Sequence, residues 1–78
     1  MPNILYKNGY RFFFYSNDHE PIHVHVEKND STAKFNLDPV ELVRSGRFNS
    51  KELKEIRFLI EENVELLKNE WYEFFNNN

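Results

Sequence analysis

Three histidines lie within seven residues and are the side chains of this sequence best suited to chemistry. They are His19, His23 and His25, and the chain has no other histidine. Imidazole nitrogens bind transition metals, and two histidines separated by one residue point to the same face of a strand. Zinc and iron accept three nitrogen ligands plus a water molecule. The spacing therefore indicates a divalent metal such as zinc, with Asp18 or Glu27 as a further ligand.

Two other interpretations of the same segment stay open. In one, the histidines are polar residues on the wet face of a strand. In the other, the segment cleaves RNA without a metal, which requires a general base, a general acid and a cation for the phosphate. Glu27, His23 or His25, and Arg11 would supply these groups, and Tyr15 would stack on a base or donate a hydrogen bond. The sequence does not decide whether any reaction is catalysed.

The strands that would position these residues are short and rich in aromatic and β-branched side chains. Asn8-Gly9 is a strong signal for a two-residue hairpin turn, because a type I′ turn needs positive φ at both positions. Period-2 alternation then indicates half-buried strands further along the chain. The expected strands cover residues 4–7, 10–15, 23–28 and 32–37.

Residues 38–46 have two interpretations. As a helix, the segment would be capped by Asp38 and ended by Gly46. As a strand, it would pair residues 40–43 with the preceding strand after an Asp38-Pro39 turn. We favour the strand.

A long helix is predicted at the C-terminal end of the chain. Asn49 followed by Glu52 is a variant of the capping box, and no Gly or Pro occurs after residue 50. The apolar residues recur at helical spacing over roughly seven turns. The sequence thus predicts one α+β domain over residues 1–78. It would comprise an antiparallel meander of four to five strands over residues 1–48, covered on one face by a helix over residues 49–75.

Alternation also assigns the two faces of the sheet. Val24 and Val26 should face the helix, which leaves His23 and His25 on the opposite, open face. The open face would then carry the candidate catalytic residues together with Phe13: Arg11, Phe13, Tyr15, His23, His25 and Glu27.

Charge is unevenly distributed over the last third of the chain. Residues 44–57 carry five basic and two acidic side chains, whereas residues 61–73 carry one basic and five acidic side chains. This order opposes the helix macrodipole, which suggests that a partner uses the basic end, although a solvated helix face would look the same. The candidate binding residues are Arg44, Arg47, Lys51, Phe58 and Tyr72.

Composition restricts the function classes. The net charge of −3 does not favour binding of nucleic acid. The chain has no Cys, which excludes disulfides and thiolate metal sites. No apolar run approaches the ~20 residues of a membrane span, and no signal peptide is evident. We therefore expect a cytoplasmic protein with no membrane partner.

The chain resembles the short bacterial proteins of domain of unknown function 4160. The resemblance is carried by Met1-Pro2-x-Ile4, by Gly9 before an aromatic strand, by Asp18-His19-x-Pro21-x-His23-x-His25 and by Glu65-Leu66-Leu67-x3-Trp71. Ile22 and Val24 depart from the family pattern, which often has a proline and an aromatic residue there, but the polar positions are kept.

This resemblance implies little about activity, because the family has no established one. Its members are discussed as components of toxin–antitoxin-like gene pairs. The resemblance therefore implies a protein-interaction component whose partner is a small protein encoded nearby. A homodimer is an alternative, because an interface would add burial that a chain of 78 residues lacks.

Overall fold

The first two strands form the predicted hairpin. In the computed structural model, which describes residues 3–76, β1 (Asn3–Lys7) pairs antiparallel with β2 (Tyr10–Phe13). Asn8 and Gly9 have φ values of 53° and 84°, as a type I′ turn requires. Met1 and Pro2, which begin the family resemblance, lie outside the described residues.

Three further strands complete an antiparallel meander in the order β1-β2-β3-β4-β5. They are β3 (His23–Lys28), β4 (Ser31–Leu37) and β5 (Val40–Gly46). The strand interpretation of residues 38–46 is confirmed, and the strand is longer than predicted. A register shift between Lys34 and Phe35 lets β5 follow β4 along its whole length.

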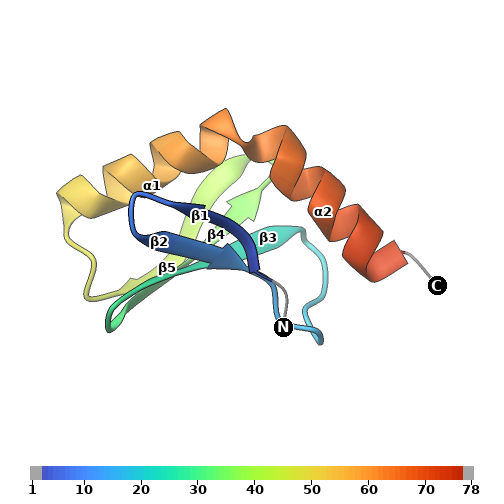
Figure 1. Ribbon diagram of the computed structural model, residues 1–78, viewed down its shortest axis with the longest axis horizontal. Helices are drawn as coiled ribbons and strands as arrows, with labels where there is room; N and C mark the ends of the chain where they lie inside the picture. The colour runs from blue at the N-terminus through green and yellow to red at the C-terminus, as the bar shows by residue number, and fades with distance from the viewer. Residues whose placement is uncertain (1–2, 77–78) are drawn as a thin grey trace.

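Two helices cover one face of the sheet, where the sequence predicts a single one. α1 (Ser50–Glu62) and α2 (Val64–Asn76) meet at Asn63, and the chain bends there (Figure 1). The side-chain Nδ2 of Asn63 donates to the carbonyl oxygen of Leu59 at 2.7 Å, so this side chain competes for a helical acceptor. The prediction of one uninterrupted helix over 49–75 is therefore wrong, although its start is correct. Asn49 and Glu52 form both hydrogen bonds of a capping box.

The core lies between the helices and the face of the sheet that alternation assigns to it. Val24 and Val26 from β3 are fully buried against Ile56 and Ile60 of α1 and Leu67 of α2, within one cluster. The same cluster also takes in Tyr10, Phe12, Phe14, Ala33, Phe35, Leu37 and Trp71. The predicted inner face is thus confirmed. Among the described residues, no helix has the length and apolarity needed to cross a membrane.

Candidate functional site

Asp18, His23 and His25 converge on the sheet face opposite the core. One ligand atom from each residue lies within 4.8 Å of the other two. Nε2 of His23 is 3.2 Å from Oδ1 of Asp18, and Nε2 of His25 is 3.2 Å from Oδ2. Two residues of one strand and one residue of the preceding loop therefore form a compact group of two imidazoles and a carboxylate.

The loop between β2 and β3 is folded so that Asp18 turns back to the sheet. The backbone N–H of Tyr15 donates to Oδ2 of Asp18 at 2.8 Å, and the N–H of Asp18 donates to the Tyr15 carbonyl at 3.1 Å. At the end of the loop, the N–H of Leu37 donates to the carbonyl of Ile22 at 3.1 Å, which ties the loop to β4. These bonds place the carboxylate over the start of β3.

His23 is the most buried member of the group, with 3% of its surface exposed. Its Nδ1 lies 2.9 Å from the carbonyl oxygen of Pro21, which can only accept, so Nδ1 carries the proton of that hydrogen bond. Its Nε2 is buried and has no hydrogen-bond partner within the described part of the chain. Trp71 covers the ring, with a centroid separation of 5.1 Å. The expectation of a wet histidine face is therefore wrong here, because a residue of α2 and the loop cover the strand.

His25 is held between aromatic rings and is also buried, with 9% of its surface exposed. Its ring centroid lies 4.6 Å from that of Tyr15, edge to face, and 5.5 Å from that of Phe13, stacked. Phe13 and His25 are direct partners across β2 and β3. The aromatic pair fixes the imidazole, so that Nε2 faces Asp18.

The protonation states suit ligation of a cation. Burial lowers the pKa of His25, and the hydrogen bond and charge of Asp18 only partly offset this, so the ring is neutral at pH 7. Burial acts to raise the pKa of Asp18, but the Tyr15 N–H and the two imidazoles outweigh it and lower the pKa overall. A neutral imidazole and an ionised carboxylate are the forms in which these side chains bind metals.

The remaining catalytic candidates lie on the same face as predicted. Arg11 and Glu27 are cross-strand partners, and Nε of Arg11 donates to Oε1 of Glu27 at 3.0 Å. The Arg11 guanidinium also lies 4.0 Å from the centroid of the Phe13 ring. Glu27 is thus engaged with Arg11 and is separate from the group formed by Asp18, His23 and His25.

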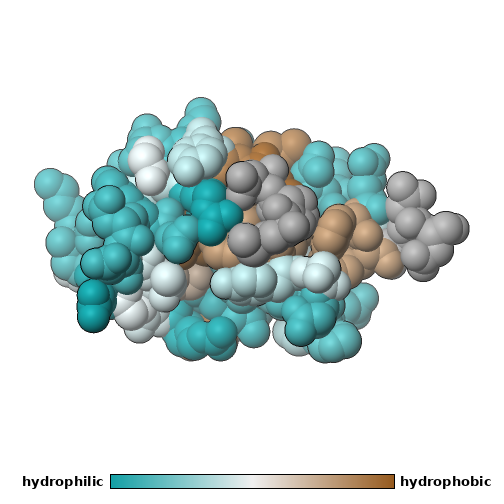
Figure 2. All heavy atoms as spheres, turned by 60° about the horizontal axis from the view of Figure 1, so that its bottom comes forward, coloured by the Kyte–Doolittle hydropathy of each residue, from teal (hydrophilic) through white to brown (hydrophobic). Residues whose placement is uncertain are grey.

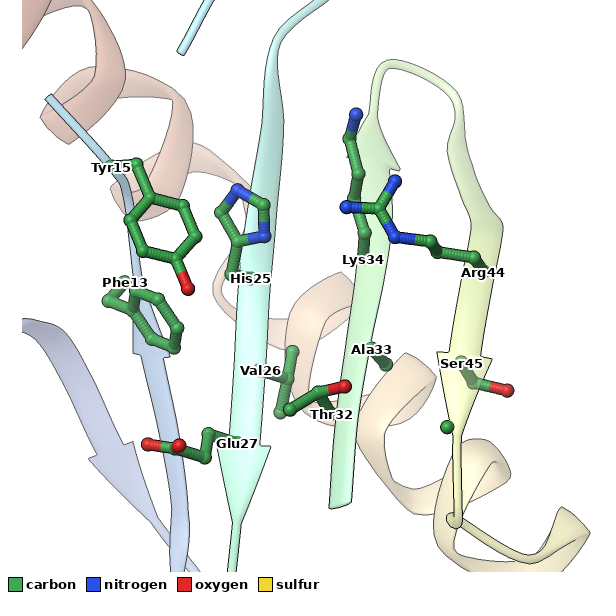
Figure 3. Close-up of a pocket in the computed structure, with 11 residues that line it drawn as sticks. Phe13, Tyr15, His25, Val26, Glu27, Thr32, Ala33, Lys34, Arg44 and Ser45 are labelled. Atoms are coloured by element: carbon green, nitrogen blue, oxygen red, sulfur yellow. The ribbon is translucent and has the colours of Figure 1, made fainter. Parts of the chain in front are cut away.

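A cavity of about 310 Å³ adjoins this group on the open face of the sheet. It extends from Tyr15 and His25 across the sheet to Arg44 on β5 (Figure 3). The other lining residues come from β2 to β5: Phe13, Val26, Glu27, Thr32, Ala33, Lys34, Ser45 and Gly46. Because His25 belongs to both, a molecule in the cavity would lie beside the Asp18–His23–His25 group.

The other predicted site residues are dispersed. His19 is exposed and does not belong to the Asp18–His23–His25 group. Arg44 lines the cavity, whereas the exposed Arg47 lies 3.8 Å from Asp30. Lys51, Phe58 and Tyr72 are exposed on the two helices.

Two residues near the site were not among the predicted site residues. Lys34 lines the cavity as the direct partner of His25 on β4, and Trp71 packs on His23. The signal for Lys34 was available, since alternation places it on the open face. The signal for Trp71 was hidden, because the residue belongs to the apolar stripe of the helix and also packs on Phe14 in the core.

Comparison with known proteins gave one match. A family model described as Domain of unknown function (DUF4160) matches residues 9–72, which is well over half of the chain and includes Asp18, His23, His25 and Trp71. Searches of curated proteins and of solved structures found no match.

Proposed function

This chain belongs to the family described as Domain of unknown function (DUF4160), and we propose that it binds a divalent transition metal ion through Asp18, His23 and His25. The observation that carries the proposal is the pair of facing atoms Nε2 of His23 and Oδ1 of Asp18, 3.2 Å apart. Because Nδ1 of His23 donates to Pro21, Nε2 of a neutral ring is an acceptor, and so is the carboxylate oxygen. A metal cation bound by both atoms would satisfy this contact between two acceptors.

The separations suit a metal ion. Ligand bonds of ~2.0–2.1 Å in tetrahedral geometry place neighbouring donor atoms about 3.3 Å apart. The two distances from the Asp18 carboxylate to the imidazoles are 3.2 Å each. The hydrogen bond of His23 to the Pro21 carbonyl is the type of outer contact that orients metal-binding histidines.

The ligand set narrows the choice of metal and its chemistry. Two imidazoles and one carboxylate are typical of zinc sites with an open position and of non-haem iron(II) sites. Three protein ligands leave room for water or a substrate, and a bound metal would act there as a Lewis acid. The nearby cavity gives such a substrate a place to lie.

The test is metal affinity measured by calorimetry on protein without a histidine tag. Wild type should bind one zinc ion, His23→Ala should lose binding, and His19→Ala should bind like wild type. His19→Ala is the matched control because it removes an exposed imidazole outside the group. Thermal unfolding followed by circular dichroism shows whether each variant is folded. Absence of binding by wild type, or equal losses in the two variants, would contradict the proposal.

A second proposal rests on a separate observation, the apolar side chains exposed on the helices. Phe58 is 58% exposed and Tyr72 is 45% exposed, and Leu66 and Phe74 are also exposed. Figure 2, which views the molecule from the side away from the helices, shows that apolar residues also reach the surface beside the C-terminal end of α2. Large exposed aromatic residues of this kind favour a contact with a protein. We propose that the exposed aromatic side chains Phe58 and Tyr72 contact the small partner protein expected of a toxin–antitoxin-like pair.

Co-purification with the small protein encoded next to this chain tests the second proposal. The Phe58→Ala and Tyr72→Ala variants should lose the partner, whereas Lys54→Ala, an exposed residue on α1, should retain it. Sedimentation of the chain alone distinguishes a homodimer. If neither a complex nor a dimer forms, or if both aromatic variants keep the partner, the interaction proposal is overturned.

A further inference from the structure

A row of paired residues crosses four strands on the open face of the sheet. Phe13 on β2 is the partner of His25 on β3, His25 is the partner of Lys34 on β4, and Lys34 is the partner of Arg44 on β5. Direct partners share a face and have neighbouring side chains. The row therefore runs from His25 of the candidate metal site to the positively charged Lys34 and then to the positively charged Arg44.

The described part of the chain provides no ion-pair partner for the two cations of this row. Among the residues that the structure describes, neither Lys34 nor Arg44 forms an ion pair, although both line the cavity. The one carboxylate in the lining, Glu27, is bonded to Arg11. Figure 3 shows the Arg44 guanidinium extending towards Lys34, while Glu27 lies at the other end of the cavity. Like charges on directly paired residues destabilise a sheet, so a bound anion would stabilise this pair.

We propose that the cavity binds a small phosphate ester, with its phosphate on Lys34 and Arg44, beside the Asp18–His23–His25 group. A guanidinium and an ammonium together match a phosphate dianion, because Arg offers two parallel N–H groups and Lys a point charge. A phosphate ester bound here would lie beside the metal ion, so its role as a substrate rests on the proposed metal site. The anion contacts themselves need only the two cations.

The shape and charge of the surroundings favour a small ligand over a nucleic acid chain. The cavity volume of about 310 Å³ is at the lower end of the range for small-molecule sites. The net charge of −3 opposes a long polyanion. Tyr15 stands at the end of the cavity opposite Arg44 and is partly exposed, so its ring offers an apolar surface to the organic part of the ester.

Calorimetric titration with inorganic phosphate and with adenosine 5′-monophosphate tests this proposal. Both probes should bind the wild-type protein, in the presence of a chelator and also after zinc loading. Adenosine 5′-monophosphate should bind more tightly than inorganic phosphate. Lys34→Gln and Arg44→Gln should each weaken phosphate binding about tenfold or more, because each removes a charge-assisted hydrogen bond. Arg47→Gln is the matched control, since it removes the same charge three residues away and outside the cavity, and it should bind phosphate like wild type.

Failure of this proposal is distinguishable from failure of the metal proposal. Lys34→Gln and Arg44→Gln should still bind zinc, and His23→Ala should still bind phosphate in chelator. The phosphate proposal is overturned if wild type binds neither probe, or if Arg47→Gln weakens binding as much as Arg44→Gln does. If the wild-type protein does not bind zinc but binds phosphate through Lys34 and Arg44, the metal proposal is overturned and the phosphate proposal stands.

Discussion

Nε2 of His23 faces Oδ1 of Asp18 at 3.2 Å in a buried position, with the opposite nitrogen of the ring bonded to the Pro21 carbonyl. This contact sets a ring nitrogen and a carboxylate oxygen at a separation that suits two ligands of one metal ion. A metal ion bound there would have Asp18, His23 and His25 as its ligands, and it would be detected as stoichiometric zinc binding.

The Asp18→Asn variant should lose metal affinity while keeping the fold. An amide is a much weaker ligand than a carboxylate, yet its oxygen can still accept the 2.8 Å hydrogen bond from the Tyr15 N–H. We expect zinc affinity to fall at least about 100-fold, since even changes in outer contacts of metal sites cost 10- to 100-fold. Competition with a chromophoric chelator measures the change. Wild-type affinity in Asp18→Asn would show that Asp18 is not a ligand.

Glu27→Gln should leave metal affinity unchanged. Its carboxylate is hydrogen-bonded to Arg11 on the neighbouring strand. Glu27 follows His25 on β3, whereas Asp18 lies in the loop that precedes β3. The same titration compares this variant with Asp18→Asn, so that the two acidic residues of this face act as a matched pair. A large loss of affinity in Glu27→Gln would instead favour Glu27 as a ligand.

Tyr10 should make stability depend on pH in the alkaline range. Burial, then the hydrogen bond and charge of Glu55 and the charge of Glu52, raise its pKa to about 12 from the usual 10.0. The folded state thus favours the protonated phenol. The contribution is fully present below pH 10 and is lost as the pH rises through about 12, where it amounts to a change on the order of 2 kcal/mol.

Urea unfolding of wild type and Tyr10→Phe over this pH range measures the effect. The free energy of unfolding should fall more steeply with pH in wild type than in the variant, because only wild type carries the phenol. Parallel curves for the two proteins would show that Tyr10 does not contribute.

Loss of the α1 cap should destabilise the whole domain. Asn49 accepts from the Glu52 N–H at 2.8 Å, and the Glu52 side chain accepts from the Asn49 N–H at 3.0 Å. Asn49→Ala should lower the free energy of unfolding by about 1 kcal/mol. Asn17→Ala, in the exposed loop before Asp18, is the comparison, and it should change stability by less than about 0.5 kcal/mol. Equal effects of the two substitutions would contradict a capping role.

Local patterns were sufficient to predict most of the fold. Alternation in β3 separates Val24 and Val26 from His23 and His25, and the structure keeps that separation. Positive φ at Asn8 and Gly9 and the cap at Asn49 follow from residue type alone. Each of these features depends on neighbours within a few residues, which a sequence displays directly.

The burial of His23, the position of Asp18 and the helix bend were not predictable from these patterns. Alternation assigns His23 to a face, but its burial depends on Trp71, which lies nearly fifty residues further along the chain. The approach of Asp18 depends on how the loop folds on Tyr15. The helix bend lies at Asn63, whose side chain donates to the Leu59 carbonyl, in a segment without Gly or Pro.

The most direct test of the central claim is a zinc titration of untagged protein followed by NMR of the histidine ring nitrogens. We predict one equivalent of bound zinc, with Nε2 of His23 and Nε2 of His25 changing to the metal-bound form. The ring of His19 should not respond. Absence of any change at His23 and His25, or a change confined to His19, would contradict a metal site built from Asp18, His23 and His25.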